Sequence, residues 1–244
     1  MNMARRVVLI TGASGGLGRV LCRAFGGSDT ALAVHACRNL EQGQALVDSQ
    51  RAAGGDAALF CADGRNALAV REMFDGIVTR WGRLDLLIHA IGIARDRLLR
   101  NMTEETWDEV IAVNLSAAFF CFREAGRRMV SQDGRSGRII AIGSAAADTG
   151  RTGQAAYTAA KRGLIALART AAREWPSVQV NVVIPGLLQT PMTAALSTRR
   201  RAEIVQENTL GHFTTVEEVS RFTVHLAGLS GVSGQIFHLD RRIV

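Results

Sequence analysis

Short apolar segments rich in β-branched residues alternate with longer segments of helical periodicity along the whole chain. Residues 84–90 are apolar almost throughout, which is typical of a parallel strand covered on both faces. Between residues 67 and 81, Val70, Phe74, Ile77 and Trp81 recur at helical spacing. The pattern predicts strands at 7–10, 31–36, 57–61, 84–90, 138–142, 178–184 and 235–239, and helices at 15–25, 40–53, 67–81, 104–129, 155–174 and 216–226.

This regular alternation predicts an α/β fold, a single Rossmann-type doubly wound parallel sheet flanked by helices. In such sheets, ligands bind at the carboxyl ends of the strands. The chain of 244 residues shows no repeat, linker or low-complexity segment. We therefore expect one domain over residues 1–244.

Composition narrows the protein class. Hydrophobic residues make up 48% of the chain, but no apolar run approaches the roughly 18 residues of a membrane helix. The apolar run after Arg5 and Arg6 is too short for a signal peptide, so we expect a cytoplasmic protein. The four cysteines lie far apart with no C-x-x-C pair, which predicts small buried residues in a reducing compartment and no metal site.

The charge of the chain is strongly basic, with a formal net charge of +7. Basic residues are spread over the whole length, the only tight run is Arg199–Arg201, and aromatic residues make up 5%. This pattern argues against nucleic-acid binding and favours acidic ligands, such as a phosphorylated cofactor or an acidic carrier protein. Lys161 is the only lysine among 29 basic residues, and Tyr157, four positions before it, is the only tyrosine.

A glycine-rich segment, Thr11–Gly18, joins the first predicted strand to the first helix. In a dinucleotide-binding turn, Gly12 would permit the tight turn, Gly16 the approach of phosphate to the backbone, and Gly18 close packing of helix on strand. The helix N-terminus would face the pyrophosphate. The predicted cofactor contacts in this turn are Gly12, Ser14, Gly15, Gly16, Leu17 and Gly18.

The end of the second predicted strand indicates which dinucleotide is bound. NAD-binding folds usually carry an acid here for the ribose 2′-hydroxyl, but this chain has Arg38 and no acid until Glu41. Arg38 favours the 2′-phosphate of NADP, unless it is an ordinary solvated loop arginine. Asp63, which follows the third strand, could accept a hydrogen bond from the adenine amino group or initiate a turn.

Ser144, Tyr157 and Lys161 suit the reduction of a carbonyl. The alkoxide formed by hydride delivery needs a proton, and a phenol with a pKa of about 10 is poorly matched to neutral pH. Lys161, at i+4 from Tyr157, shares its helix face and is predicted to lower the pKa of the phenol. Ser144 would donate a hydrogen bond to the substrate oxygen. The alternative is a Tyr packed beside an exposed Lys.

With these motifs, the chain resembles the short-chain dehydrogenase/reductases from Thr11 to Asp240. The resemblance rests on TGASGGLG, Asn114 in AVNLS, Ser144, YTAAK at 157–161, and Pro185-Gly186 followed by Thr190. It implies that Asn114 kinks a helix and holds a water that passes protons to Lys161. It also implies that Pro185 and Gly186 contact the nicotinamide, Thr190 bonds the carboxamide, and Ala90 and Gly92 line the cofactor site.

Within this family the sequence is most similar to the 3-oxoacyl-[acyl-carrier-protein] reductases, through residues 93–96, 153–157 and 216–219. The resemblance implies NADPH-dependent reduction of a 3-oxoacyl thioester, a substrate on an acidic carrier protein, and a homotetramer. Three segments depart from the pattern. His89-Ala90-Ile91-Gly92 replaces NNAG, with His89 expected to make the backbone hydrogen bonds of the first Asn. Arg135 keeps one docking arginine while Arg169 or Arg173 replaces the other, and Asp240-Arg241-Arg242 replaces D-G-G.

Two other functions fit the same residues. A reductase or dehydrogenase of a free small ketone, sugar, steroid or quinone would need the same four residues. The altered segments also allow a catalytically silent NADP-binding subunit, although the complete set of Asn114, Ser144, Tyr157 and Lys161 argues against it. Pocket-lining loops are expected around 94–99, 145–152 and 187–201.

Overall fold

A computed structural model describes residues 5–132, 137–194 and 196–240, and its centre is one seven-stranded sheet. The strands are β1 (Arg6–Thr11), β2 (Thr30–Ala36), β3 (Asp56–Cys61), β4 (Leu86–His89), β5 (Gly137–Ile142), β6 (Val178–Pro185) and β7 (Ile236–Leu239). Their order is β3-β2-β1-β4-β5-β6-β7, and every neighbouring pair is parallel. The predicted doubly wound parallel sheet is therefore confirmed.

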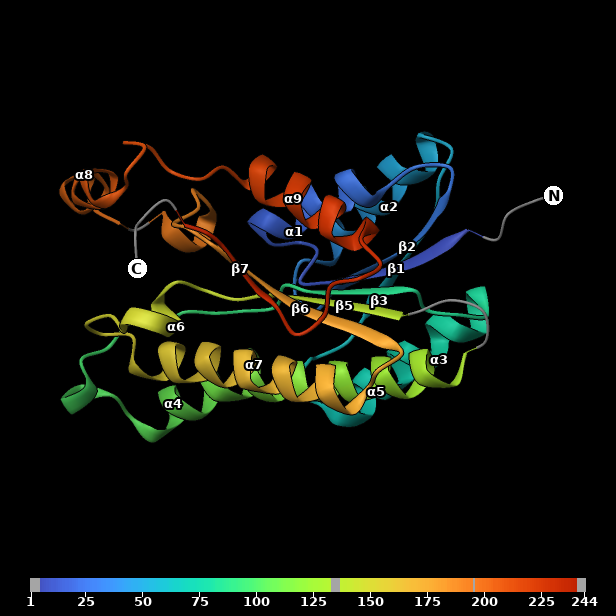
Figure 1. The fold of residues 1–244 in the computed structure, drawn as a ribbon, viewed down its shortest axis with the longest axis horizontal. Helices are drawn as coiled ribbons and strands as arrows, with labels where there is room; N and C mark the ends of the chain where they lie inside the picture. Colours follow the sequence, from blue (N-terminus) through green and yellow to red (C-terminus); the bar gives the residue numbers. More distant parts are fainter. Residues whose placement is uncertain (1–4, 133–136, 195, 241–244) are drawn as a thin grey trace.

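Helices cover both faces of the sheet, which gives three layers (Figure 1). One face carries α1 (Gly16–Phe25), α2 (Leu40–Ala52) and α9 (Val216–Gly228). The other carries α3 (Ala67–Trp81), α4 (Glu104–Ile111), α5 (Ala117–Ser131) and α7 (Ala155–Glu174). The remaining elements are α6 (Ala146–Thr149), α8 (Thr198–Glu207), the 3-10 turns η1 (Leu99–Asn101) and η3 (Pro191–Thr193), and the π-helical η2 (Ala112–Ser116).

The two apolar clusters explain the near-continuous hydrophobic strands. Successive side chains of a strand point to opposite faces. Accordingly Leu9 and Leu87 enter the cluster under α3, α5 and α7, whereas Ile10 and Ile88 enter the cluster under α1, α2 and α9. The strand order reverses between β1 and β4, so their carboxyl ends open a crevice there.

Several predicted elements need correction. The strand expected over 84–90 is only Leu86–His89, and the helix expected over 104–129 is divided by η2. Residues 198–201 begin α8 rather than a loop. Only Ile204 of this helix is buried, so the helix has almost no apolar periodicity. The N-cap at Ser197 and the i,i+4 pair Arg199–Glu203 were the features of the sequence that could have predicted it.

The cysteine prediction is half wrong. Cys22 and Cys121 are buried in the core, but Cys37 and Cys61 are exposed. Cys37 directly follows β2, and Cys61 is the last residue of β3. None of the four forms a disulfide. Within the described ranges no helix is long and apolar enough to cross a membrane.

Candidate active site

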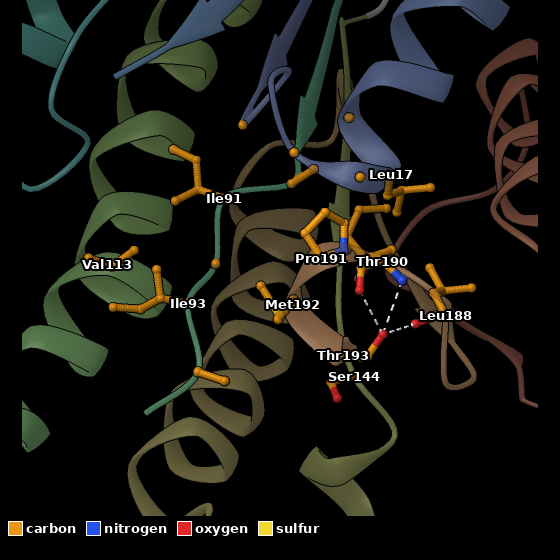
Figure 2. Close-up of a pocket in the computed structure, with 18 of the residues that line it drawn as sticks. Leu17, Ile91, Ile93, Val113, Ser144, Leu188, Thr190, Pro191, Met192 and Thr193 are labelled. Carbon is orange, nitrogen blue, oxygen red and sulfur yellow. Dashed lines mark hydrogen bonds between the residues drawn. The ribbon is translucent and has the colours of Figure 1, made fainter. Parts of the chain in front are cut away.

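A cavity of about 840 Å³ opens at the carboxyl edge of the sheet, beside the reversal of strand order. Figure 2 shows part of its wall, where Ile91, Ile93 and Val113 face Thr190, Pro191 and Met192 across the opening. Residues from all three expected loops contribute to the lining. So do the predicted cofactor and catalytic residues Gly12, Ser14, Gly15, Gly16, Leu17, Gly18, Arg38, Asp63, Ala90, Gly92, Ser144, Tyr157, Lys161, Pro185, Gly186 and Thr190. Asn114 alone of the predicted set does not line the cavity.

Each glycine of the turn leaves room for a different neighbour. Gly12 has φ +68°, and a Cβ there would lie 2.8 Å from the Ala90 carbonyl oxygen. A Cβ at Gly18 would lie 2.2 Å from the Gly12 carbonyl oxygen, so α1 can pack against the turn only without it. At Gly16 the close neighbour is the Thr190 side chain, 2.8 Å from a Cβ. Gly16 therefore also admits the loop after β6.

Tyr157 and Ser144 come together in the lining of this cavity. Ser144 follows β5 directly, and Tyr157 lies in the first turn of α7. The two side chains share a hydrogen bond. This pair is positioned by the buried contact of α7 with the sheet, because Ala156 and Ala160 are fully buried and leave no gap.

Lys161 lies one turn further along α7 and is buried. Its Nζ donates to the Ile142 carbonyl oxygen at 3.0 Å and lies 6.0 Å from the centre of the Tyr157 ring. Burial lowers the pKa of Lys161 from 10.5 to about 8. The ammonium is therefore close to neutralisation just above physiological pH, which suits a proton relay.

The predicted direction of the Tyr157 pKa is wrong. Burial raises it above 10, and the Ser144 hydrogen bond and the charge of Arg151 oppose burial without overcoming it. The Lys161 ammonium donates to the Ile142 carbonyl oxygen and lies 6.0 Å from the centre of the ring. The phenol consequently keeps its proton at neutral pH, which is the state a proton donor requires.

Asn114 is buried at the centre of the π-helical segment η2. Its amide nitrogen donates to the carbonyl oxygens of Val110 and Ile93, both at 2.9 Å, and its oxygen accepts from the Ile93 N–H at 3.1 Å. A Cβ on Gly92 would lie 2.9 Å from this oxygen and 3.5 Å from the Lys161 Nζ. The helix is therefore interrupted at Asn114, and Asn114 and Lys161 both lie against Gly92.

At the far end of the cavity, Arg38 and Asp63 lie on neighbouring loops after β2 and β3. Asp63 accepts from the Arg65 backbone N–H at 2.9 Å, so its turn-initiating role is confirmed. The Arg65 guanidinium also binds the carboxylate, with Nη2 2.6 Å from Oδ2. The hydrogen bond and charge of Arg65 lower the pKa of Asp63, although burial opposes this. Arg65 thus pairs with this carboxylate, and Arg38 lies on the neighbouring loop.

His89 is fully buried and does not line the cavity. Its Nδ1 lies 3.1 Å from the Thr11 hydroxyl, so the expected hydrogen bonds to backbone are replaced by a side-chain contact between β4 and β1. Among the described residues its Nε2 has no hydrogen-bond partner, and the ring edge packs against Phe122. Burial lowers the pKa of His89 to about 3. A neutral imidazole therefore replaces the usual amide.

The cavity mouth contains polar residues that the sequence did not single out as functional. Gln154 donates to both carboxylate oxygens of Asp96, at 3.1 and 3.2 Å. The Arg97 N–H donates to the Gly153 carbonyl oxygen at 2.8 Å, which ties the loop after β4 to the start of α7. Arg151 lies on the same rim. In the sequence, Arg151 and Gln154 lie between Ser144 and Tyr157, and this position could have predicted that they lie at the site. Three further polar residues on the cofactor side, Arg19, Asn39 and Gln42, also line the cavity.

The structure gives little support for the arginines predicted to dock a carrier protein. Arg135 and the pair Arg241-Arg242 lie outside the described residues. Arg169 and Arg173 are exposed on α7, 12 and 16 residues after Tyr157. At the helical rise these are roughly 18 and 24 Å along the axis, away from the mouth formed by this chain. Asp240 is described and lies near Gly186, with its Oδ1 3.4 Å from where a Cβ would be.

The sequence profile of the short chain dehydrogenase family matches residues 6–201. The chain belongs to this family. It is 35% identical, over 95% of both chains, to the 3-oxoacyl-[acyl-carrier-protein] reductase FabG of Staphylococcus aureus. To FabG of Escherichia coli it is 34% identical over 98% of both chains.

Solved structures of the family share the same fold. A short chain dehydrogenase from Burkholderia cenocepacia in complex with NADP superimposes with a TM-score of 0.90 at 26% identity, covering 99% of both chains. A dehydrogenase/reductase from Sinorhizobium meliloti gives 0.89 at 31% identity, covering 98% of this chain and 94% of the other. This short-chain dehydrogenase is thus an oxidoreductase acting on carbonyl or CH–OH groups.

Proposed function

We propose that this short-chain dehydrogenase reduces a 3-oxoacyl thioester, carried by an acyl carrier protein or CoA, to the 3-hydroxyacyl thioester with NADPH. The observation that carries the proposal is the hydrogen-bonded Ser144–Tyr157 pair, one helical turn before buried Lys161, in a cavity that the glycine turn also lines. The similarity to FabG from two bacteria supports the acyl thioester as substrate. The chain would act as one domain over residues 1–244.

The cavity fits a phosphorylated dinucleotide in shape and charge. Gly16 and Gly18 lie in the first turn of α1 and line the cavity, where the helix N-terminus would stabilise a pyrophosphate. Arg38 and Arg65 would face the 2′-phosphate, and Asp63 the adenine. NADPH supplies the hydride when it is bound. The NADP complex of the Burkholderia cenocepacia relative supports this choice of cofactor.

Each of the four predicted catalytic residues would then have a distinct role. Ser144 donates a hydrogen bond to the substrate oxygen as negative charge develops on it. Tyr157 gives its proton to the same oxygen, and its raised pKa keeps that proton available at neutral pH. Lys161, with a pKa of about 8, can return a proton to Tyr157. Asn114 holds the broken helix next to Lys161, against Gly92.

The apolar part of the cavity supports an acyl substrate. Ile93, Val113, Leu188, Met192 and Leu196 contribute apolar side chains to its lining. Gly186 and Pro185 would contact the nicotinamide, and Thr190 the carboxamide, as the family resemblance implies. An acidic carrier protein would meet a basic chain of net charge +7, which favours encounter.

Turnover of acetoacetyl-carrier protein, acetoacetyl-CoA and free ketones, each with NADPH and NADH, tests the proposal. We expect NADPH-dependent reduction of a thioester, with free ketones slower. Faster turnover of a free ketone, sugar, steroid or quinone would assign the alternative substrate class, and no turnover of any would favour the silent subunit. Tyr157→Phe is the matched control, because it removes one hydroxyl and should abolish turnover while NADPH still binds.

Assembly and location remain predictions from the sequence. We propose a homotetramer, and exposed Trp107, Phe119 and Val130 on α4 and α5 are apolar side chains that a second copy could cover. Light scattering of the purified chain measures the mass directly. The cytoplasmic location is likewise proposed, together with a part in fatty acid biosynthesis.

A further inference from the structure

His35 connects the glycine turn to the neighbouring strands. It is the second-last residue of β2, is 3% exposed, and lines the cavity. Its Nδ1 accepts the Gly12 backbone N–H at 3.1 Å, and its own carbonyl oxygen accepts the Ala13 N–H at 3.0 Å. One residue therefore holds the two amides at which the chain leaves β1 and turns toward α1.

The second ring nitrogen binds the opposite side. Nε2 lies 2.9 Å from the carbonyl oxygen of Ala62, the residue between β3 and Asp63. A backbone N–H can only donate and a carbonyl can only accept, so Nδ1 carries no proton and Nε2 carries one. The two contacts are compatible only with a neutral imidazole in this single tautomer. The ring thus spans from the end of β1 to the end of β3.

These two contacts join the two ends of the proposed cofactor site. Gly12 begins the turn that would hold the pyrophosphate, and Ala62 precedes the Asp63–Arg65 pair at the adenine end. A shift of the Gly12 amide would move the start of α1 relative to Asp63. A fixed distance between the glycine turn and the adenine end favours cofactor binding, because a dinucleotide contacts both at once.

We propose that His35 is a positioning residue for the cofactor, a neutral imidazole that fixes the glycine turn relative to the adenine end of the site. The proposal rests on the proposed function only in the identity of the cofactor, NADPH. His35 contacts protein backbone on both sides, so its effect reaches the cofactor through Gly12 and through Ala62.

Two substitutions separate the two contacts. His35→Asn can place an amide oxygen where Nδ1 lies and so keep the acceptor for Gly12. His35→Gln can place an amide nitrogen near Nε2 and keep the donor for Ala62, but it leaves the Gly12 N–H without its acceptor. His89→Asn is the matched control, because His89 is also a buried histidine at a strand end but does not line the cavity.

The experiment measures the Kd of NADPH by fluorescence without substrate, together with kcat at saturating NADPH and the thermal midpoint. We expect His35→Gln to raise the Kd about five- to tenfold, the effect of one lost hydrogen bond. Its kcat at saturation should stay within about twofold. His35→Asn keeps the Gly12 contact but loses the Ala62 contact, so it should raise the Kd by a similar factor, whereas His89→Asn should leave it unchanged. The ¹⁵N spectrum of His35, assigned by its loss in His35→Asn, should show a protonated Nε2 and an unprotonated Nδ1.

An unchanged Kd in His35→Gln, or a protonated Nδ1 in the spectrum, would overturn the proposal. An equal rise of Kd in His89→Asn would show a general loss of sheet packing instead, and would overturn it as well. A wild-type chain that binds NADPH but reduces no thioester contradicts the proposed substrate and leaves this test intact. A wild type that binds neither NADPH nor NADH contradicts both.

Discussion

Lys161 donates a 3.0 Å hydrogen bond to the carbonyl oxygen of Ile142, the last residue of β5. This bond joins α7, which carries Tyr157, to the strand that precedes Ser144. The same contact fixes the ammonium inside the protein, where burial lowers its pKa to about 8. Lys161 should therefore be needed for turnover, although its buried charge lowers the stability of the fold.

The rate of reduction should fall as the pH rises through about 8, because Lys161 then loses the proton that it passes to Tyr157. The profile of kcat/KM against pH for a thioester substrate measures this. In Lys161→Arg, whose guanidinium stays charged, any residual activity should lack the step near pH 8. A wild-type profile that is flat between pH 7 and about 10 would contradict the assignment.

Lys161→Met should abolish turnover without lowering stability. An unfolded lysine keeps its proton up to pH 10.5, whereas the folded one loses it near 8, so stability rises with pH between these values. At neutral pH the buried ammonium therefore costs about 3 kcal/mol. Removing it gains that amount and loses about 1–3 kcal/mol by leaving the Ile142 carbonyl unpaired. Thermal unfolding, with exposed Arg169→Met as control, tests this; a large drop in the midpoint would contradict it.

Ser144→Ala should slow reduction about 10²-fold, because the developing oxyanion loses a hydrogen-bond donor. The same change removes the hydrogen bond that opposes burial at Tyr157, so the pKa of Tyr157 should rise further. Oxidation of the 3-hydroxyacyl thioester, which needs the phenolate, should then require a higher pH than in wild type. Parallel pH profiles in the oxidative direction measure the shift. Identical profiles would mean that Ser144 does not act on Tyr157.

Arg38→Asp should change the preference between cofactors. Asp can accept from a ribose 2′-hydroxyl and repels a 2′-phosphate, so we expect NADPH to bind about 10²-fold more weakly and NADH to bind more tightly. The ratio of the two Kd values is the measurement. Arg23→Asp, on α1 and outside the cavity lining, is the charge-matched control. Loss of both cofactors to the same extent would show that Arg38 holds the loop rather than the phosphate.

The parts of the fold that depend on local pattern were predictable. Apolar strands such as Leu86–Ile88 and the i+4 spacing of Tyr157 and Lys161 encode the sheet and the face of α7 directly in the sequence. The π-helical segment at Asn114 was not predictable from periodicity, because its cause is a pair of tertiary hydrogen bonds to Ile93.

The electrostatics of the site depend on contacts that no sequence pattern carries. The i+4 rule places Lys161 beside Tyr157, but the ammonium turns to Ile142, so burial decides the pKa of the phenol. Likewise Asp63 was predicted for the adenine, and only the structure shows Arg65 bound to it. The sequence places His35 at the end of a predicted strand but does not show what its ring contacts. The backbone partners of its ring, Gly12 and Ala62, follow β1 and β3 and lie 23 and 27 residues away in the sequence.

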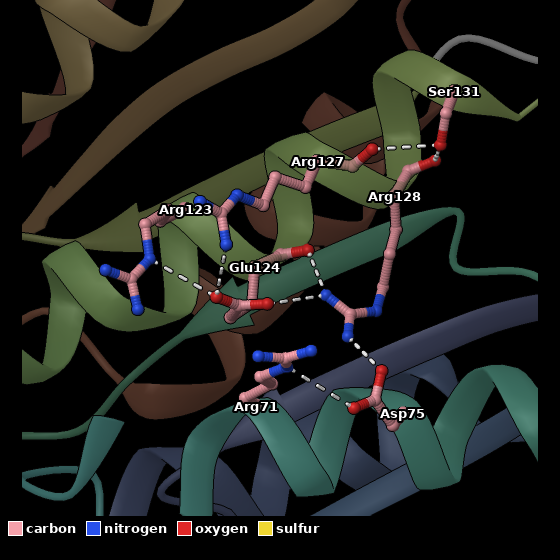
Figure 3. Close-up of polar contacts among 7 residues, drawn as sticks. All are labelled: Arg71, Asp75, Arg123, Glu124, Arg127, Arg128 and Ser131. Carbon is pink, nitrogen blue, oxygen red and sulfur yellow. Dashed lines mark hydrogen bonds and ion pairs between the residues drawn. The ribbon is translucent and has the colours of Figure 1, made fainter. Parts of the chain in front are cut away.

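The charged cluster on α5 leads to the last prediction, Glu124→Gln. Glu124 is 2% exposed, and its carboxylate accepts from Arg123, Arg127 and Arg128, while Arg128 also reaches Asp75 on α3 (Figure 3). Burial opposes ionisation, but the Arg128 hydrogen bond and charge outweigh it, so the pKa of Glu124 lies below its usual 4.5. The cluster therefore stabilises the fold above the unfolded pKa, and this contribution is lost as the pH falls below it.

Glu124→Gln should lower the free energy of unfolding by about 2 kcal/mol at neutral pH, because three arginines lose a buried counter-charge. The loss should shrink toward acid pH, where Glu124 itself becomes protonated. Urea unfolding at several pH values measures both effects. Glu203→Gln is the matched control, since Glu203 pairs with Arg199 and Arg200 on exposed α8 and should change little. Equal effects of the two substitutions at neutral pH would show that burial does not strengthen the Glu124 cluster.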